Sequence, residues 1–294
     1  MRTAVAFSSD SFHAHQTTDR NGIDAFLYGE TSDAAILAFR GTLPVRLSNS
    51  PTRLGQILTD WINNTSATLV RGSPFGLPGY VHQGFAGSLD NLWTSPGGLQ
   101  SIFPYISRAT AKGKRFLVTG HSKGGALACL AALRLAETGE TELKPDGVCT
   151  FAAPRAGNHE FAAAFDRAFT NRARRFEFQD DIVPHLPPSE GFWFALQEAF
   201  NNVIAHSAKS AAGWSWPSLI AGFTALTRVG TYESAGQLQF IDWNGNLRDQ
   251  DTAALQSERL ERLGHALAGS LPDIAKAHLP MRGFGYMSFL ENRA

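Results

Sequence analysis

One pentapeptide has the residue types needed for nucleophilic catalysis. Residues 120–124 read Gly-His-Ser-Lys-Gly, which matches the pattern Gly-x-Ser-x-Gly. A serine hydroxyl attacks a carbonyl carbon only when a base removes its proton, and that base needs a carboxylate to orient it. Because the chain has 28 glycines, such a pattern also arises by chance, and its context in the sequence decides its interpretation.

The serine lies between two apolar segments of different type. Residues 116–119 (FLVT) predict a buried strand, and residues 124–137 (GGALACLAALRLAE) predict a helix. This order is typical of a nucleophile elbow, in which Gly120 and Gly124 permit a sharp turn and Ser122 is exposed above the sheet. The helix would place N–H groups and partial positive charge beneath the serine, where they stabilise an oxyanion. The alternative is a serine that only caps a helix.

Other segments must position this turn. The sequence predicts buried strands at 34–39, 147–152 and 175–178, a strand pair from 237–243, and a helix at 251–271. Strands that alternate with helices indicate an α/β fold, with a mostly parallel central sheet flanked by helices. Two segments do not fit the alternation, so we interpret residues 43–79 and 189–228 as insertions in a single domain spanning residues 1–294.

Four motifs in order resemble the class 3 lipase family. They are AFRGT at 38–42, YVHQGF at 80–85, GHSKGGA at 120–126 and DDIVPHLPP at 180–188. The resemblance runs from about residue 34 to residue 188, with a weaker tail near residue 278. It implies an α/β-hydrolase fold and a triacylglycerol lipase or related esterase. The sequence has no HExxH, EF-hand or phosphate-binding glycine motif, so we expect neither a metal nor an organic cofactor.

The resemblance also selects the acid and the base. In α/β-hydrolases the chain order is serine, acid, histidine. The family's acid directly precedes IVP, which selects Asp181 and leaves Asp180 as the rival. His121 adjoins the nucleophile and is expected to point away from it and support the elbow. Among the histidines after the acid we expect His278 to be the base.

Two alternatives to His278 remain. His185 lies four residues after the acid, and His265 lies off the leucine stripe of the helix at 251–271.

The oxyanion hole needs about two N–H donors. One is the backbone N–H of Lys123, the residue after the nucleophile. The resemblance implies that Thr42, after Arg40 and Gly41, is the second; the alternative is a turn glycine with a capping threonine. The segment after Thr42 resembles the family's lid.

Aromatic residues gather in the second insertion. We expect these side chains to roof an acyl pocket, although they could equally pack against the body of the protein; they include Phe192, Trp193, Trp214 and Trp216.

The amino-acid composition argues against some classes of binding partner. Lys plus Arg number 26 and Asp plus Glu number 26, so a nucleic-acid partner is not expected. No apolar run is long enough to suggest a membrane span. The N-terminal residues lack the apolar core of a secretory signal, and the two cysteines do not suggest a disulfide framework. We therefore expect a cytoplasmic protein, with export by an unconventional route as the alternative.

The function predicted from the sequence is hydrolysis of lipid esters, with triacylglycerols as the first candidate substrate. A phospholipase A1 or a feruloyl-type carboxylesterase would use the same groups. A lipid-binding module with a dead site is the non-enzymatic alternative. The expected partner is a lipid or other ester at a lipid–water interface, and the oligomeric state stays open.

Overall fold

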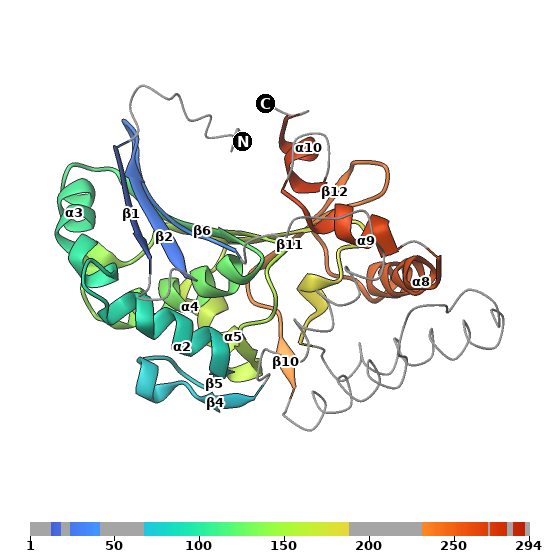
Figure 1. The fold of residues 1–294 in the computed structure, drawn as a ribbon, viewed down its shortest axis with the longest axis horizontal. Helices are drawn as coiled ribbons and strands as arrows, with labels where there is room; N and C mark the ends of the chain where they lie inside the picture. The colour runs from blue at the N-terminus through green and yellow to red at the C-terminus, as the bar shows by residue number, and fades with distance from the viewer. Residues whose placement is uncertain are drawn as a thin grey trace.

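A computed structural model describes residues 13–18, 24–41, 68–187, 231–269, 271–280 and 285–291. Its larger sheet crosses the molecule from β1 to β12 (Figure 1). The strand order is β1 (His13–Thr18), β2 (Ala25–Glu30), β3 (Ala34–Phe39), β6 (Arg115–His121), β7 (Gly147–Phe151), β9 (Ala173–Phe178), β11 (Gln237–Ile241) and β12 (Leu247–Arg248).

The five strands from β3 to β11 run parallel, and β1, β2 and β12 are antiparallel at the two edges. The predicted mostly parallel sheet is therefore confirmed. Strands covered on both faces read as continuous apolar runs, which is why β3 begins and ends where the sequence predicts. The carboxyl ends of β3, β6 and β9 meet at one edge of the sheet, where functional groups collect in open α/β sheets.

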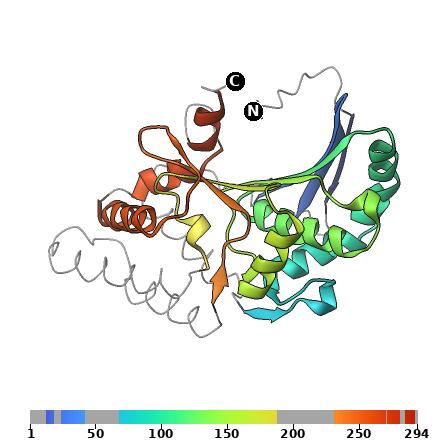
Figure 2. The same ribbon diagram turned by 180° about the vertical axis from the view of Figure 1, so that it is seen from behind.

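Helices cover the sheet in two groups (Figures 1 and 2). One group surrounds α4 (Lys123–Glu137) and comprises α2 (Gln83–Thr94), α3 (Leu99–Ala111) and α5 (His159–Ala168). Every residue of α4 from Gly124 to Leu133 is buried, as expected of a helix that is apolar on all sides. The other group gathers near β11 and comprises α8 (Ala253–Gly269), α9 (Leu271–His278) and α10 (Gly285–Glu291).

The helix predicted at 251–271 corresponds to α8. Leu255 and Leu263 on this helix are buried, and so is Arg259, which is 3% exposed. A buried guanidinium needs charged or polar partners. Its partners lie on β9 and in the loop after it, so α8 reaches the edge of the sheet through a polar contact as well as through leucines.

A smaller antiparallel sheet lies beside α2 and α5. Its strands, in order, are β10 (Tyr232–Glu233), β8 (Gly157–Asn158), β5 (Tyr80–His82) and β4 (Leu69–Arg71). Residues 68–79, which we assigned to the first insertion, form β4 and the short helix η1 (Ser73–Phe75). The rest of that insertion and all of residues 189–228 lie outside the described residues.

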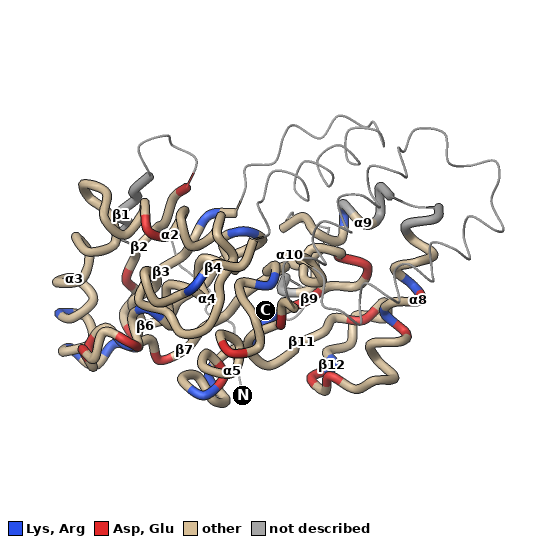
Figure 3. Tube along the Cα trace, turned by 90° about the horizontal axis from the view of Figure 1, so that it is seen from below, with Lys and Arg blue, Asp and Glu red and all other residues tan. Residues whose placement is uncertain are grey.

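Lys and Arg are interspersed with Asp and Glu along the described chain (Figure 3). Within the described ranges, no helix combines the length and the hydropathy needed to cross a bilayer. Cys129 on α4 is buried, Cys149 on β7 is partly buried, and both are free thiols. Burial raises the pKa of each thiol to about 12.

Candidate active site

Ser122 lies in the turn between β6 and α4. Its backbone has φ 56° and ψ −133°, a conformation that is strained for any residue with a Cβ. The turn is held because Ser122 N donates to the carbonyl of Phe151 at 2.9 Å and Gly125 N donates to the carbonyl of Ser122 at 2.8 Å. We expected the serine to be exposed, but it is 5% exposed.

The glycines of the elbow leave no room for a side chain. A Cβ on Gly120 would lie 2.1 Å from the carbonyl oxygen of Gly124, and one on Gly124 would lie 2.2 Å from that of Phe39. Both distances are far below van der Waals contact. Both positions therefore require glycine, because other backbone atoms lie too close to leave room for a side chain. This is expected where a strand turns sharply into a helix.

His278 is the last residue of α9 and faces the serine. Its Nε2 lies 3.0 Å from Ser122 Oγ, and its Nδ1 lies 3.1 Å from both carboxylate oxygens of Asp181. Ile274 and Ala277 are buried and fix the helix against the body of the protein. The structure thus brings together the predicted nucleophile, base and acid, which are spread over 156 residues.

His121 supports His278 from beside the nucleophile. Burial, together with the charge of His278, lowers the pKa of His121 to about 4, so its ring is neutral. The Nε2–H of His121 donates to the carbonyl oxygen of His278 at 2.8 Å. The two rings lie 4.9 Å apart, so His121 holds both the backbone and the ring of His278.

Asp181 is 1% exposed and is held from three sides. The backbone N–H of Val183 donates to Oδ1 at 3.0 Å, and the hydroxyl of Tyr286 donates to Oδ2 at 2.7 Å. Burial and the nearby Asp181 charge raise the pKa of Tyr286 well above its usual value, so the hydroxyl remains a donor. The sequence contains Tyr286 in the stretch after His278, but nothing in its spacing indicates this contact.

The alternative residues have other partners or positions. Asp180 accepts a hydrogen bond from Trp243 Nε1 at 3.0 Å. His185 is buried, and its Nε2 lies 3.0 Å from a guanidinium nitrogen of Arg259. His265 is exposed on α8. None of the three has a described hydrogen bond to Ser122.

A buried charge cluster lies behind the acid. Glu177, four residues before Asp181, accepts from Arg175 at 2.8 Å and also from Arg259. Burial by itself raises the pKa of Glu177, but the charges of Arg259 and Arg175 outweigh it and lower this pKa. Both ends of the acid loop are therefore tied to the same arginine, because Arg259 also contacts His185 after the acid.

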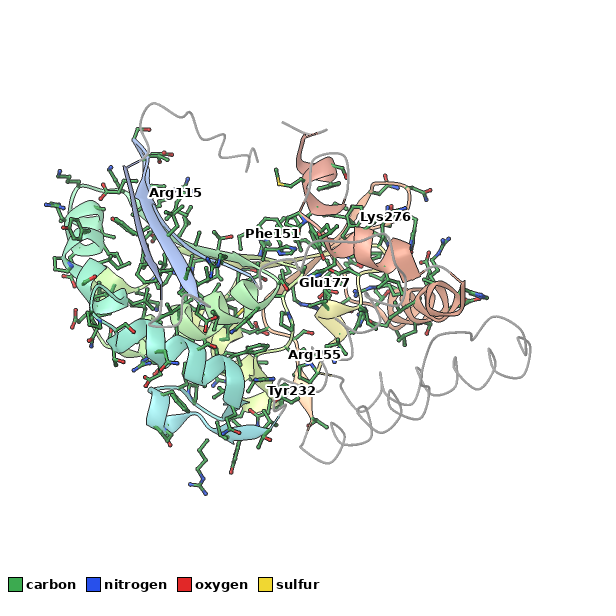
Figure 4. The ribbon with its side chains drawn as sticks, in the orientation of Figure 1. Arg115, Phe151, Arg155, Glu177, Tyr232 and Lys276 are labelled. Atoms are coloured by element: carbon green, nitrogen blue, oxygen red, sulfur yellow. The ribbon has the colours of Figure 1, made fainter. Side chains whose placement is uncertain are left out.

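Arg155 holds the far end of the same loop. Its guanidinium donates to the carbonyl oxygens of His185 and Pro187, both at 3.0 Å. Figure 4 shows Arg155 and Glu177 in the region around η3 (Val183–His185). Because these contacts are partly buried and charge-assisted, they restrict the acid loop more than surface contacts would.

Only one of the two predicted oxyanion donors lies among the described residues. Lys123 is the first residue of α4, and its backbone N–H follows the nucleophile in the turn. Its side chain forms an ion pair with Asp24, with Nζ 2.7 Å from Oδ1, a contact that sequence spacing does not indicate. Thr42 lies outside the described residues, as do Phe192, Trp193, Trp214 and Trp216.

This geometry suits acyl transfer. A neutral imidazole within hydrogen-bond reach of a hydroxyl accepts its proton, and a carboxylate at the other ring nitrogen fixes the tautomer and stabilises the imidazolium. The N-terminus of α4 adds partial positive charge beneath Ser122. Among the described residues, no three His, Cys, Asp or Glu side chains are grouped to hold a metal ion.

Comparison with known proteins finds one matching family and several named relatives. The family described as Lipase (class 3) matches residues 37–191. A lipase of Caenorhabditis elegans is 36% identical over 120 residues, 41% of this chain and 32% of the relative. Secreted mono- and diacylglycerol lipase 1 of Fusarium solani is 43% identical over 74 residues, 25% of this chain and 21% of the relative. The chain thus spans about a third or less of these relatives.

Solved structures are similar in fold. The crystal structure of a lipase from Rhizopus microsporus var. chinensis superposes with a TM-score of 0.52 and 22% identity, covering 84% of this chain and 70% of that one. The α/β-hydrolase fold expected from the sequence is confirmed by this similarity and by the parallel sheet.

The cytoplasmic location expected from the sequence is wrong. Relatives from Fusarium solani and Gibberella zeae are named secreted lipases, which points to the extracellular medium. The expectation depended on the N-terminal residues and on the low cysteine count. A fold that is stable without disulfides needs few cysteines in any compartment, so their number carries no information about destination.

Proposed function

The chain belongs to the class 3 lipase family, and from this premise we propose that it hydrolyses carboxylic esters of lipids through an acyl-enzyme on Ser122. One observation carries the proposal: His278 Nε2 lies 3.0 Å from Ser122 Oγ while Asp181 accepts from the opposite ring nitrogen. A module that only binds lipids has no need of this arrangement.

The first half-reaction forms the acyl-enzyme. Ser122 Oγ attacks the ester carbonyl carbon as His278 Nε2 takes the hydroxyl proton. The Asp181 carboxylate stabilises the resulting imidazolium. Negative charge develops on the former carbonyl oxygen and is stabilised by the backbone N–H of Lys123 and, on sequence grounds, by Thr42. The intermediate then collapses, and the leaving alcohol takes the proton from His278.

The second half-reaction releases the acid. A water molecule gives a proton to His278 Nε2 and attacks the acyl carbon, and the same donors stabilise the second oxyanion. Ser122 Oγ leaves with the proton from His278, which restores the enzyme and frees a fatty acid. The net reaction consumes one ester and one water and yields one alcohol and one acid.

Adjacent carboxylates provide a matched test of the acid. Asp181→Asn should lower kcat for a chromogenic ester by about 10³ to 10⁴-fold, because an amide fixes the wrong imidazole tautomer. Asp180→Asn is the control, since this carboxylate bonds to Trp243, and it should retain kcat within a few-fold. Equal losses in the two variants would reject Asp181 as the acid.

A substrate series tests the ester class. We propose triacylglycerols as the first candidate, and the comparison sets emulsified triacylglycerol against phosphatidylcholine vesicles and a feruloyl ester. A clear preference for one of the last two substrates would favour the phospholipase A1 or the feruloyl-type esterase. Labelling with a fluorophosphonate tests catalysis itself, because a wild-type protein without an adduct on Ser122 would be a binding module.

The role that we propose for the two insertions rests on the sequence alone. We assign residues 43–67 and 189–228 to covers of the acyl site, with the aromatic residues of the second insertion as acyl contacts. Deletion of residues 195–225 should change the preferred acyl length in the chromogenic series. An unchanged preference would reject the second cover.

A further inference from the structure

A largely buried ion pair spans the end of β3 next to the nucleophile. Asp24 directly precedes β2, and Lys123 directly follows the nucleophile Ser122 at the start of α4. Their charged atoms are 2.7 Å apart, and the side chains are 7% and 19% exposed. Because β3 lies between β2 and β6 in the sheet, the two side chains reach across the carboxyl end of β3.

The chain that leaves β3 is fixed by the same short segment. Arg40 N donates to the carbonyl oxygen of Ala25 at 2.9 Å, and Ala25 is the neighbour of Asp24. Residues 24 and 25 therefore hold the chain before Gly41 through a backbone hydrogen bond and hold the start of α4 through the ion pair.

Gly41 lies directly against the elbow. A Cβ on this glycine would lie 2.7 Å from the carbonyl oxygen of His121 and 3.3 Å from Ser122 Cβ. One proposed oxyanion donor, the N–H of Lys123, follows the elbow, and the other, Thr42, follows Gly41. The two segments that carry the proposed donors are therefore in contact at Gly41, next to the Asp24–Lys123 pair.

We propose that Asp24 and the side chain of Lys123 are positioning residues that set the geometry of the oxyanion hole. The inference rests on the proposed hydrolysis. Oxyanion donors act only when they are preorganised at the site where charge develops, and a displacement of about 1 Å costs about 100-fold in rate. The ion pair provides this rigidity by coupling β2, the end of β3 and the start of α4.

The chain contains a matched control at the opposite edge of the same strands. Glu30 ends β2 and Lys114 directly precedes β6. Their charged atoms are 2.9 Å apart, and the side chains are 24% and 19% exposed. This second pair joins the same two strands across β3, but at the edge away from Ser122. Variants of this second pair therefore measure how the loss of an ion pair affects the sheet when nothing changes next to Ser122.

The test measures kcat and KM for a short chromogenic ester. Asp24→Asn and Lys123→Met should each lower kcat by about 10 to 100-fold, with KM changed by less than about threefold. Lys123→Arg should recover most of kcat, because it restores the pair. Glu30→Gln and Lys114→Met should retain kcat within about twofold. Urea unfolding of each variant ensures that only folded protein is compared.

A double variant separates positioning from charge. If the Lys123 charge acted directly on the oxyanion, Asp24→Asn would keep or raise kcat. If the single variants were slow only because each leaves one buried charge unpaired, the Asp24→Asn/Lys123→Met double variant would approach wild type. Positioning requires the double variant to stay as slow as the slower single variant. Wild-type kcat in Asp24→Asn, or recovery in the double variant, would overturn the inference, whereas a wild-type protein without esterase activity would instead overturn the proposed function.

Discussion

The hydroxyl of Tyr286 on α10 lies 2.7 Å from Asp181 Oδ2 and also accepts a hydrogen bond from the backbone N–H of Phe178 at 3.1 Å. Phe178 is the last residue of β9, so one phenol joins the end of the strand to the acid that follows it. The ring packs at 5.9 Å from His121 and at 5.6 Å from Phe178. Tyr286 thereby links the acid to the elbow.

Tyr286→Phe should therefore lower both activity and stability. The variant removes one donor from a buried carboxylate and leaves the N–H of Phe178 without its partner. Hydrogen bonds to charged groups contribute about 1.5 to 3 kcal/mol, so we expect kcat to fall by about tenfold and the free energy of unfolding to fall by about 2 kcal/mol. Ester hydrolysis and urea unfolding measure the two effects, and wild-type values for both would contradict this role.

The strained backbone of Ser122 predicts an unusual order of stability. At φ 56° and ψ −133° a Cβ costs about 1 to 3 kcal/mol, a cost that glycine avoids. Ser122→Gly and Ser122→Ala should both be inactive, but the glycine variant should have the higher free energy of unfolding, by about 1 kcal/mol after the entropy of its unfolded chain is subtracted. Urea unfolding tests this order, and an alanine variant of equal or greater stability would show that the turn is unstrained.

Glu177 should stabilise the fold only above mildly acidic pH. Its folded pKa is lowered by Arg259 and Arg175, so its contribution is full above the unfolded value of about 4.3 and is lost as the pH falls toward the folded value. Glu177→Gln should cost about 3 kcal/mol at pH 7, and the difference from wild type should shrink below pH 4.5. Glu258→Gln, at an ion pair that is 40% exposed, is the control and should cost less than about 1 kcal/mol.

Three buried neutral histidines predict a loss of stability in mild acid. Burial lowers the pKa of His82 and His121 to about 4 and that of His185 well below its usual value. Between about pH 6.5 and 4 the unfolded chain binds protons that the folded protein does not, so stability falls as the pH falls. Each such histidine adds about 1.4 kcal/mol per pH unit to the slope.

His82→Asn tests this slope. His82 accepts a hydrogen bond from Phe85 N at the start of α2, and asparagine also caps helices well. The variant should reduce the slope of unfolding free energy against pH by about one proton, whatever its absolute stability. His159→Asn, at an exposed pair with Glu233, is the control. An unchanged slope in His82→Asn would mean that folding does not lower the pKa of His82.

The sequence predicts the local parts of this molecule well. The strands β3, β6 and β7 and helix α4 are recognisable because each contains a mainly apolar run, whereas β9 (ARRFEF) includes charged residues and was predicted only over residues 175–178. The antiparallel strands β1 and β2 were not predicted, because polar residues or a glycine interrupt the apolar pattern of their segments, HAHQTT and AFLYGE. The two-residue strands β8 and β12 are too short to show any periodicity.

The site likewise has parts that the sequence predicts and parts that it does not. The elbow around Ser122 is predictable because its residues form a short contiguous pattern, although only Gly120 is required by atoms within a few residues and Gly124 is required by the carbonyl of Phe39 on β3. Asp180 and Asp181 are neighbours with the same side chain, and their partners Trp243 and Tyr286 lie far along the chain. The Asp24–Lys123 pair likewise joins distant residues. Such contacts depend on how the elements pack, and residue spacing does not record packing.

Neither cysteine of this chain is in its reactive form at neutral pH. Thiolates are the form that reacts with oxidants and disulfides, and Cys129 and Cys149, with pKa values near 12, are almost entirely protonated at neutral pH. They are the only two cysteines of the chain. Both thiols of this chain are therefore expected to stay free under reducing as well as oxidising conditions.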